Sequence, residues 1–362
     1  MRSIRPFAAW KINGEIMERK LSVENLSVSI KTKDGVLRAV RGVSFELFEG
    51  ETLAIVGESG SGKSMTSRAI LGILPKTATV DGGKILFREL DLADCGEKVY
   101  GQIRGKKISM IFQDPTACLN PIARIGEQIV ETILQNATQK ISKAQAKSRV
   151  ISLMEEVGIP DAKTRFRQYP FEFSGGMKQR IVIAIALSSN PEILICDEPT
   201  TALDVTIQAQ IIDLIKTLKK ERKLSVIFIT HDLGVVANVA DRVAVMYAGK
   251  IVEYGKTKEI FYAPKHPYTW ALLASQPDLD TKERLEEIQG VPPDLTKEII
   301  GDAFAPRNKY AMQIDFEEEP PFFKVSKTHY AATWLLDKRA PSIDLPASLD
   351  ERIKRMKGDK NE

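Results

Sequence analysis

The octapeptide GESGSGKS at residues 57–64 is the stretch that decides the fold. It matches the pattern G-x-x-x-x-G-K-[ST], in which glycines let backbone N–H groups surround phosphate oxygens. The apolar run TLAIVG at 52–57 comes before it, and the helix-like run SMTSRAILGIL at 64–74 comes after it. A buried strand that leads through a glycine loop into a helix is the context that a phosphate-binding loop requires, because the helix N-terminus also attracts anions.

This loop predicts a nucleotide site with a magnesium ion. Lys63 is long enough to reach the β and γ phosphates, and the Ser64 hydroxyl is a suitable ligand for Mg²⁺. The residues of the loop expected to contact the nucleotide are Gly57, Glu58, Ser59, Gly60, Ser61, Gly62, Lys63, Ser64 and Met65.

Polar side chains follow three other apolar runs. EILICDEP at 192–199 is strand-like and ends in two acids. Asp197 is expected to hold Mg²⁺, directly or through water, and Glu198 to polarise an attacking water molecule. His231 directly follows the run SVIFIT, where an imidazole can contact the γ-phosphate. Gln113 follows the run ISMIF and is expected to join either the Mg²⁺ shell or the attacking water.

A second glycine turn lies in FSGGMKQR at 173–180. Ser174 can cap the helix that follows, while Gly175 and Gly176 expose backbone N–H groups at its start. The turn is therefore a second anion site, distant in the chain from the first. One nucleotide cannot easily be held twice by distant parts of one chain. We therefore expect two molecules to face each other, the turn of each closing over the nucleotide of the other.

The remaining pattern predicts an α/β fold with a P-loop NTPase (RecA-like) core. Strand-like and helix-like runs alternate, which is typical of parallel βαβ units, and the runs at 242–247 and 250–255 complete the sheet with an antiparallel edge. Between about 126 and 189 only helix-like runs occur, which indicates an inserted α-helical subdomain. From about 262 onward Pro, Asp and Glu become more frequent, which indicates a separate C-terminal extension.

These patterns predict the boundaries of three regions and of two terminal tails. The nucleotide-binding domain is expected at 20–262, the helical subdomain within it at about 114–190, and the extension at 263–345. Residues 1–19 and 346–362 are expected to be tails, and ERIKRMKGDKNE at the end has the character of a frayed charged segment.

Composition limits the classes of function. The hydrophobic content of 43% and charged content of 28% are ordinary for a globular protein, and a net charge of +4 is too small to argue for nucleic acid. No apolar run reaches the ~18 residues of a spanning helix, and the start MRSIRPFAAWKING lacks a clear secretory signal. Three cysteines in no metal or disulfide pattern, Cys95, Cys118 and Cys196, indicate a reducing compartment. We expect a soluble protein that docks if it works at a membrane.

Taken together, the motifs resemble the nucleotide-binding subunit of ABC transporters over about residues 20–260. GESGSGKS is similar to the Walker A loop, FSGGM to the signature turn and ILICDE to the Walker B strand with Glu198 as catalytic base. Gln113 matches the Q-loop glutamine, Asp204 in TALD the D-loop and His231 the switch histidine. The resemblance implies ATP and Mg²⁺ as ligands, with Asp204 at the nucleotide, and a head-to-tail dimer in which the signature turn acts in trans.

A closer resemblance is to the oligopeptide/dipeptide branch of ABC importers. It is carried by QDPTACLNP at 113–121, KHPYTWALLASQP at 265–277 and QGVPPDL at 289–295, the last being similar to the "D" type of subunit. It implies a second, different ATP-binding subunit, two permease subunits, an extracellular solute-binding protein and a place on the cytoplasmic face of the cell membrane. The helical subdomain with the Q-loop region would receive the permease's coupling helix, and no nucleic acid is expected.

Other functions remain open at this stage. Relatives in this branch are also assigned to oligosaccharides and nickel. A soluble ABC ATPase without a transport role is a further alternative, although such proteins often fuse two cassettes. A P-loop kinase is disfavoured by FSGGM and His231, and a non-catalytic subunit by the intact Lys63, Asp197, Glu198 and His231.

Two departures from the family pattern carry expectations of their own. Members of this branch often hold an iron–sulfur cluster on four extension cysteines. The corresponding positions here are Asp302, Asn308, Asp315 and Thr333, which are poor cluster ligands, so no cluster is expected. The family's adenine-stacking aromatic residue is also missing between residues 24 and 44, where Ile30 or Val36 would have to pack against the base. We therefore expect weak selection between ATP and GTP.

Overall fold

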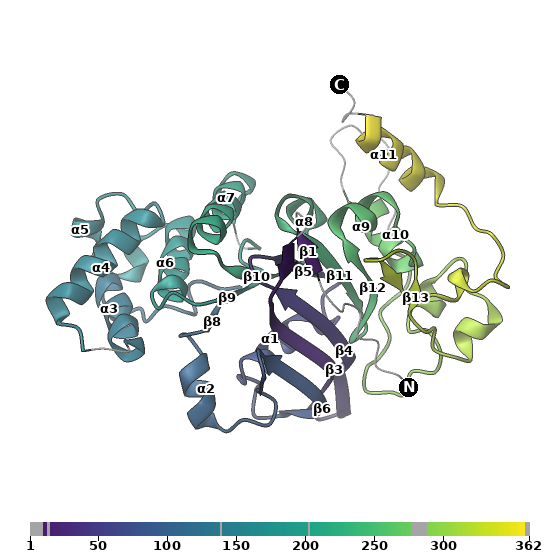
Figure 1. Ribbon diagram of the computed structural model, residues 1–362, viewed down its shortest axis with the longest axis horizontal. Helices are drawn as coiled ribbons and strands as arrows, with labels where there is room; N and C mark the ends of the chain where they lie inside the picture. Colours follow the sequence, from purple (N-terminus) through teal and green to yellow (C-terminus); the bar gives the residue numbers. More distant parts are fainter. Residues whose placement is uncertain (1–9, 13–14, 138–139, 202, 277–287, 359–362) are drawn as a thin grey trace.

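Two β-sheets form the centre of the molecule (Figure 1). The computed structural model describes residues 10–12, 15–137, 140–201, 203–276 and 288–358. In spatial order, the eight strands of the main sheet are β13 (Phe323–Lys324), β14 (Tyr330–Ala331), β12 (Lys250–Lys256), β11 (Arg242–Tyr247), β5 (Thr52–Val56), β10 (Ser225–Thr230), β9 (Ile193–Asp197) and β8 (Ile108–Ile111). The strands from β11 to β8 are parallel, and β12, β14 and β13 add an antiparallel edge. This confirms the predicted fold class.

The smaller sheet is antiparallel and lies against one face of the core. In spatial order, its strands are β4 (Gly35–Phe48), β3 (Arg19–Thr32), β6 (Ala78–Phe87) and β7 (Leu90–Asp91). The sequence pattern does not predict β6 or β7. A further short pair joins β1 (Trp10–Ile12) to β2 (Glu15–Met17).

The helices of the described residues are distributed over the core, the helical subdomain and the extension. They are α1 (Lys63–Ile70), α2 (Glu97–Ile103), α3 (Ile125–Asn136), α4 (Lys143–Glu156), α5 (Ala162–Arg165), α6 (Gly175–Leu187), α7 (Val205–Arg222), α8 (Leu233–Val239), α9 (Thr257–Tyr262), α10 (Pro267–Ala274) and α11 (Ala347–Gly358). Single 3₁₀ turns lie at Pro170–Glu172, Ala305–Arg307, Gln313–Phe316 and Trp334–Leu336. Every residue of β5, β9 and β10 is buried, which is why these strands have continuous apolar sequences instead of alternating ones.

The helical subdomain consists of α3 to α6, inserted between β8 and β9 (Figure 1). Its core includes Ile129, Val150, Met154 and Ile181, all fully buried. The same apolar cluster continues into Leu194 and Phe228 of the main sheet, so the subdomain and the sheet share one core. The subdomain therefore has a continuous packed connection to the strands that carry the candidate site.

The extension beyond α9 packs onto the other side of the core. Its strand β14 pairs with β12, and the buried Glu253 of β12 accepts hydrogen bonds from the backbone N–H groups of Lys265 and His266. His329 of the extension contacts the same carboxylate at 2.7 Å. Because a buried carboxylate is costly unless its oxygens are paired, Glu253 fixes two distant segments of the extension to the sheet.

The C-terminal segment differs from the sequence-based expectation. Residues 351–358, predicted to be part of a frayed tail, belong to α11. Leu349 and Ile353 of this helix are buried in the apolar cluster that contains Phe304. Arg352 donates to the backbone oxygens of Leu273 and Gln276 at the end of α10. The spacing of two apolar residues in a charged helix was too weak a signal to predict this docking.

Among the described residues, none of the helices has both the length and the apolar character needed to cross a membrane.

Candidate functional site

The phosphate loop connects the end of β5 to the start of α1 and depends on its glycines. Gly57 has φ 154°, and a Cβ added there would lie 2.0 Å from the Met246 backbone oxygen. Gly62 has φ 100°, and a Cβ there would lie 2.4 Å from the Ala39 backbone oxygen. Any other residue at either position would push the loop out of its path. The loop is therefore held against β4 and β11 by contacts that only glycine permits.

Lys63 closes the phosphate loop on itself. Its Nζ donates to the backbone oxygens of Gly57 and Glu58, both at 2.8 Å, and lies 3.4 Å from the Ser61 Oγ. Burial lowers the pKa of Lys63, while the nearby carboxylates of Glu198, Asp197 and Glu58 act to raise it. A buried ammonium whose partners are neutral carbonyl groups is well suited to exchange them for phosphate oxygens, which carry a full negative charge.

Asp197 and Ser64 meet at the end of β9. The Ser64 Oγ donates to Asp197 Oδ1 at 2.8 Å. Burial raises the pKa of the Asp197 carboxyl, opposed by the Ser64 hydrogen bond and by Arg68. Hydroxyl and carboxylate oxygens are the ligands that Mg²⁺ prefers. In the part of the chain that the structure describes, no group of three or more acidic, His or Cys side chains could hold a metal alone. Phosphate oxygens and water would have to complete the shell.

Glu198 is held at the carboxyl end of the main sheet by its neighbours. Gln113 Nε2 and Thr201 Oγ1 both donate to Glu198 Oε2 at 3.0 Å, and His231 Nδ1 lies 3.5 Å from Oε1. Because β8, β9 and β10 are parallel neighbours in the sheet, the three predicted residues Gln113, Glu198 and His231 follow strands that end at the same edge. The structure thus brings together residues that lie far apart in the chain.

The backbone at Glu198 is unusual. Its φ is 48°, in the left-handed region, and its N–H donates to the Ile229 backbone oxygen at 2.9 Å. A non-glycine residue in this region is strained by roughly 1 kcal/mol or more and is retained where the surroundings fix it. Thr201 is part of that fixation, and no sequence motif predicts it. A threonine three residues after the acid was the only available signal.

The signature turn lies in the helical subdomain, at the start of α6, apart from α1 and the phosphate loop (Figure 1). Ser174 caps α6 by accepting the Met177 N–H at 3.4 Å, and both Ser174 and Gly175 are exposed. A Cβ at Gly176 would lie 2.5 Å from the Ile207 side chain, so α6 approaches α7 closely only because this residue is glycine. Asp204 caps α7 through the Ile207 N–H at 3.0 Å. The turn and the phosphate loop of one chain therefore do not form one site.

The parts of β3 and β4 between residues 24 and 44 offer no aromatic side chain to a base. Val36 at the start of β4 is 50% exposed, and Ile30 of β3 pairs with Leu37. The next residue along β4, Arg38, donates its backbone N–H to the Leu295 oxygen of the extension at 3.0 Å. The aliphatic side chains at 30 and 36 are available to a base only for non-specific packing.

We therefore expect GTP to replace ATP with a turnover within about tenfold at equal concentration. Stacking on an aromatic ring is worth about 1–3 kcal/mol per base, and this chain lacks that term for either purine. The measurement is the rate of phosphate release with each nucleotide. A strict preference for ATP would contradict this expectation.

The four positions that could have carried cluster cysteines are polar and buried. Each side chain accepts a hydrogen bond from a nearby backbone N–H: Asp302 from Phe304, Asn308 from Tyr310, Asp315 from Met312 and Thr333 from Leu335. Each therefore caps its own turn, so these residues have a structural function that does not require a metal. Carboxylate, amide and hydroxyl groups remain poor ligands for iron–sulfur clusters.

Asp302 gives the extension a pH-dependent stability. Burial raises the pKa of its carboxyl from the usual value of 3.8 to about 6. The folded state therefore binds this proton more tightly than the unfolded chain. The ionised Asp302 therefore destabilises the folded state. This destabilisation is absent below pH 3.8, the usual pKa of the carboxyl in the unfolded chain, and reaches its full size above about pH 6.

Replacing Asp302 by Asn should raise the free energy of unfolding at about pH 8 by roughly 3 kcal/mol and change it by only about 0.5 kcal/mol at about pH 4. The Asn carbonyl can still accept the Phe304 N–H. Urea unfolding at the two pH values measures the effect. Asp34→Asn, in the exposed turn between β3 and β4, is the matched control and should change neither value. An equal effect of Asp302→Asn at both pH values would be inconsistent with this assignment.

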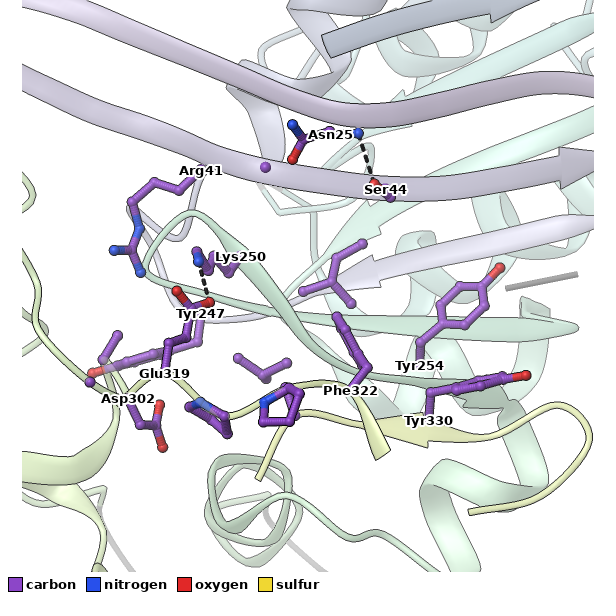
Figure 2. Close-up of a pocket in the computed structure, with 18 residues that line it drawn as sticks. Asn25, Arg41, Ser44, Tyr247, Lys250, Tyr254, Asp302, Glu319, Phe322 and Tyr330 are labelled. Carbon is purple, nitrogen blue, oxygen red and sulfur yellow. Dashed lines mark hydrogen bonds and ion pairs between the residues drawn. The ribbon is translucent and has the colours of Figure 1, made fainter. Parts of the chain in front are cut away.

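A cavity of about 470 Å³ lies between β4, β12 and the extension, and none of the predicted nucleotide-binding residues lines it. Figure 2 shows Arg41 and Lys250 on the core side and Glu319 and Asp302 on the extension side, with Lys250 paired to Glu319. The candidate nucleotide-binding residues lie elsewhere, at and beyond the carboxyl ends of β5, β8, β9 and β10.

Three features define an ABC-type ATPase. They are a phosphate loop after the central parallel strand β5, an acid pair at the end of β9, which is the next strand but one, and a signature turn on an inserted helical subdomain. The chain matches the family "ABC transporter" over residues 40–201 and the family "Oligopeptide/dipeptide transporter, C-terminal region" over residues 252–314. It belongs to the family of ABC transporter ATP-binding subunits that includes oligopeptide and dipeptide transport proteins.

Several relatives match along nearly their whole length. The oligopeptide transport ATP-binding protein OppD of Bacillus subtilis is 57% identical, with 93% of this chain and 95% of the relative covered. The dipeptide transport ATP-binding protein DppD of Lactococcus lactis is 55% identical, with 95% and 99% covered. Among solved structures, the dimeric ATP-binding cassette MJ0796 bound to ADP and Pi has a TM-score of 0.59 and 26% identity, covering 66% of this chain and 98% of its own.

Proposed function

We propose that this chain is the ATP-hydrolysing subunit of an importer for oligopeptides or dipeptides at the cytoplasmic face of the cell membrane. The observation that carries the proposal is the match to relatives named for oligopeptide and dipeptide transport, over 95% and 99% of their lengths. The similarity includes residues 252–314, which match the family "Oligopeptide/dipeptide transporter, C-terminal region". That region separates the peptide branch from ABC ATPases in general.

The proposed assembly contains a second, different ATP-binding subunit and two permease subunits, with a solute-binding protein outside the membrane. The exposed signature turn at Ser174 and Gly175 supports a partner that presents the same elements in reverse. The Q-loop region and the helical subdomain would contact the permease. Importers for oligosaccharides or nickel, and a soluble ABC ATPase, are the alternatives that the experiment below separates.

In the proposed reaction, the residues act at fixed places. Lys63 leaves the Gly57 and Glu58 carbonyl groups and binds the β and γ phosphates. Glu198 accepts the proton of the attacking water, while Gln113 and His231 keep its carboxylate in place. Mg²⁺, held by Ser64 and Asp197, would neutralise charge on the phosphates. The partner's signature turn would close the site with backbone N–H groups.

The experiment is purification of the chain from its own membranes in mild detergent, with partners identified by mass spectrometry. Recovery of two permease subunits and a second ATP-binding subunit would support the importer and the heterodimer. The associated solute-binding protein is then screened against peptides, oligosaccharides and nickel. Recovery only from the soluble fraction, with ribosomal or nucleic-acid partners, would still be consistent with an ATPase but would contradict the transport proposal.

A further inference from the structure

The extension reaches into the phosphate loop at Glu58. Arg307, in the 3₁₀ turn Ala305–Arg307, forms a two-pronged ion pair with the Glu58 carboxylate, at 2.7 Å from Nη1 to Oε2 and 3.0 Å from Nη2 to Oε1. The Glu58 backbone N–H donates to the Tyr268 hydroxyl of α10 at 2.8 Å. Both the side chain and the backbone of one phosphate-loop residue are thus held by groups from beyond residue 262.

Arg307 is fixed in this position from several sides. Its side chain is only 5% exposed, and Nη1 also donates to the Tyr247 hydroxyl at 3.2 Å. Nε donates to the Gln289 backbone oxygen at 2.9 Å, and Nη2 to that of Ile288 at 3.3 Å. The guanidinium group also lies against the rings of Tyr247 and Phe304. A planar group with this many directed donors has very little freedom, so Glu58 is held in one place.

The segment that Arg307 binds also contacts the strand beside the loop. Leu295, a few residues after Gln289, accepts the Arg38 N–H of β4 through its backbone oxygen. The neighbouring Ala39 of β4 has its carbonyl group against Gly62 of the phosphate loop. The extension therefore supports the loop at Glu58 directly and at Gly62 through β4.

Charge gives this contact a consequence for nucleotide binding. Glu58 adjoins Gly57, and the Lys63 ammonium lies on the backbone oxygens of both residues. The Glu58 carboxylate is three-quarters buried, so its charge is poorly screened by water. Without Arg307, a bare carboxylate would face the incoming phosphates and would compete with them for Lys63. With Arg307 in place, that charge is neutralised and the loop keeps its path.

We propose that Arg307 is a positioning residue for nucleotide binding, and that through it the C-terminal extension sets the ATP affinity of the phosphate loop. This inference rests on the ATPase function and goes beyond the family assignment. In this proposal the extension takes part in nucleotide binding by its own subunit. The alternative is that the extension only packs against the core and has no effect on the nucleotide site.

The test is equilibrium binding of a fluorescent ATP analogue to the full chain and to four variants. Arg307→Met should weaken binding by about tenfold, since it leaves the Glu58 charge unpaired. The double variant should bind as Glu58→Gln alone does, because no bare charge remains once Glu58 is neutral, so Arg307→Met should add no further loss in that background. Arg307→Lys should fall between the wild type and Arg307→Met. In steady-state hydrolysis the loss should appear in KM, with kcat largely retained.

Arg352→Met is the matched control. Arg352 also anchors the extension, and within the described residues its hydrogen bonds go to the Leu273 and Gln276 carbonyl groups and not to the phosphate loop. Its variant should bind the analogue as the wild type does. Wild-type affinity in Arg307→Met would overturn the inference, and so would a double variant that binds more weakly than Glu58→Gln. Failure of the wild-type chain to bind the analogue at all would instead overturn the ATPase function on which the inference rests.

Discussion

Glu198→Gln is expected to bind ATP normally and to hydrolyse it at least about 100-fold more slowly than the wild type. The amide keeps the shape of the side chain and can still accept the Gln113 and Thr201 hydrogen bonds, but it cannot take a proton from water. Loss of a positioned general base typically lowers the rate by about 10²–10⁴. Because bound ATP persists, the variant should also accumulate as a closed dimer, seen as an ATP-dependent shift in gel filtration with its partner subunit.

Glu192→Gln is the control for this experiment. Glu192 lies just before β9, the strand after which Glu198 follows, and its carboxylate pairs with the exposed Arg88 and Lys107. Its variant should therefore hydrolyse ATP at the wild-type rate. Near-normal turnover in Glu198→Gln would show that Glu198 is not the general base and would make His231 the next candidate.

Lys63→Ala is expected to lose nucleotide binding, with an affinity lowered by at least about 100-fold. The substitution removes the cation that the phosphates would bind and leaves the Gly57 and Glu58 carbonyl groups without their present donor. A ligand that binds only the folded state raises the melting temperature, so ATP should stabilise the wild type and leave the variant unchanged. Thermal unfolding with and without ATP measures this difference.

Lys107→Ala, at a surface pair with Glu192, is the corresponding control and should keep the full ATP-dependent shift. The melting temperature of Lys63→Ala without ATP reports whether the loop still folds. An ATP-dependent shift equal to that of the wild type in Lys63→Ala would show that the nucleotide is bound elsewhere.

Much of the core could be predicted from sequence because its strands are buried on both faces. Such strands have continuous apolar runs that end in glycine or acids, as at Val56 and Asp197. The strand β6 was missed for the opposite reason. Its middle contains Asp81, Gly82 and Gly83, which are typical of a turn, and most of its residues are exposed. It is a strand because β3 pairs with it, and Gly83 is needed there because a Cβ would lie 2.5 Å from the Asn25 backbone oxygen.

The candidate site could be predicted as a set of residue types, but its geometry could not. The motifs named Gln113, Glu198 and His231 separately, whereas their convergence depends on the parallel pairing of β8, β9 and β10 across the helices inserted between them. Thr201 was missed because a hydroxyl carries no pattern of its own. The docking of α11 was missed because only Leu349 and Ile353 mark its buried face.

The class of chemistry could be predicted from sequence, because a phosphate loop is a local structure. Eight consecutive residues set the backbone path, and glycines at 57 and 62 are required wherever that path occurs. Only the tertiary structure decided what surrounds the loop. Arg307 and Glu58 are 249 positions apart, and no periodicity or motif connects two charged residues over such a distance. They meet because the extension adds β14 to the edge of the main sheet and packs Phe304 into its core, which places the guanidinium group against the phosphate loop.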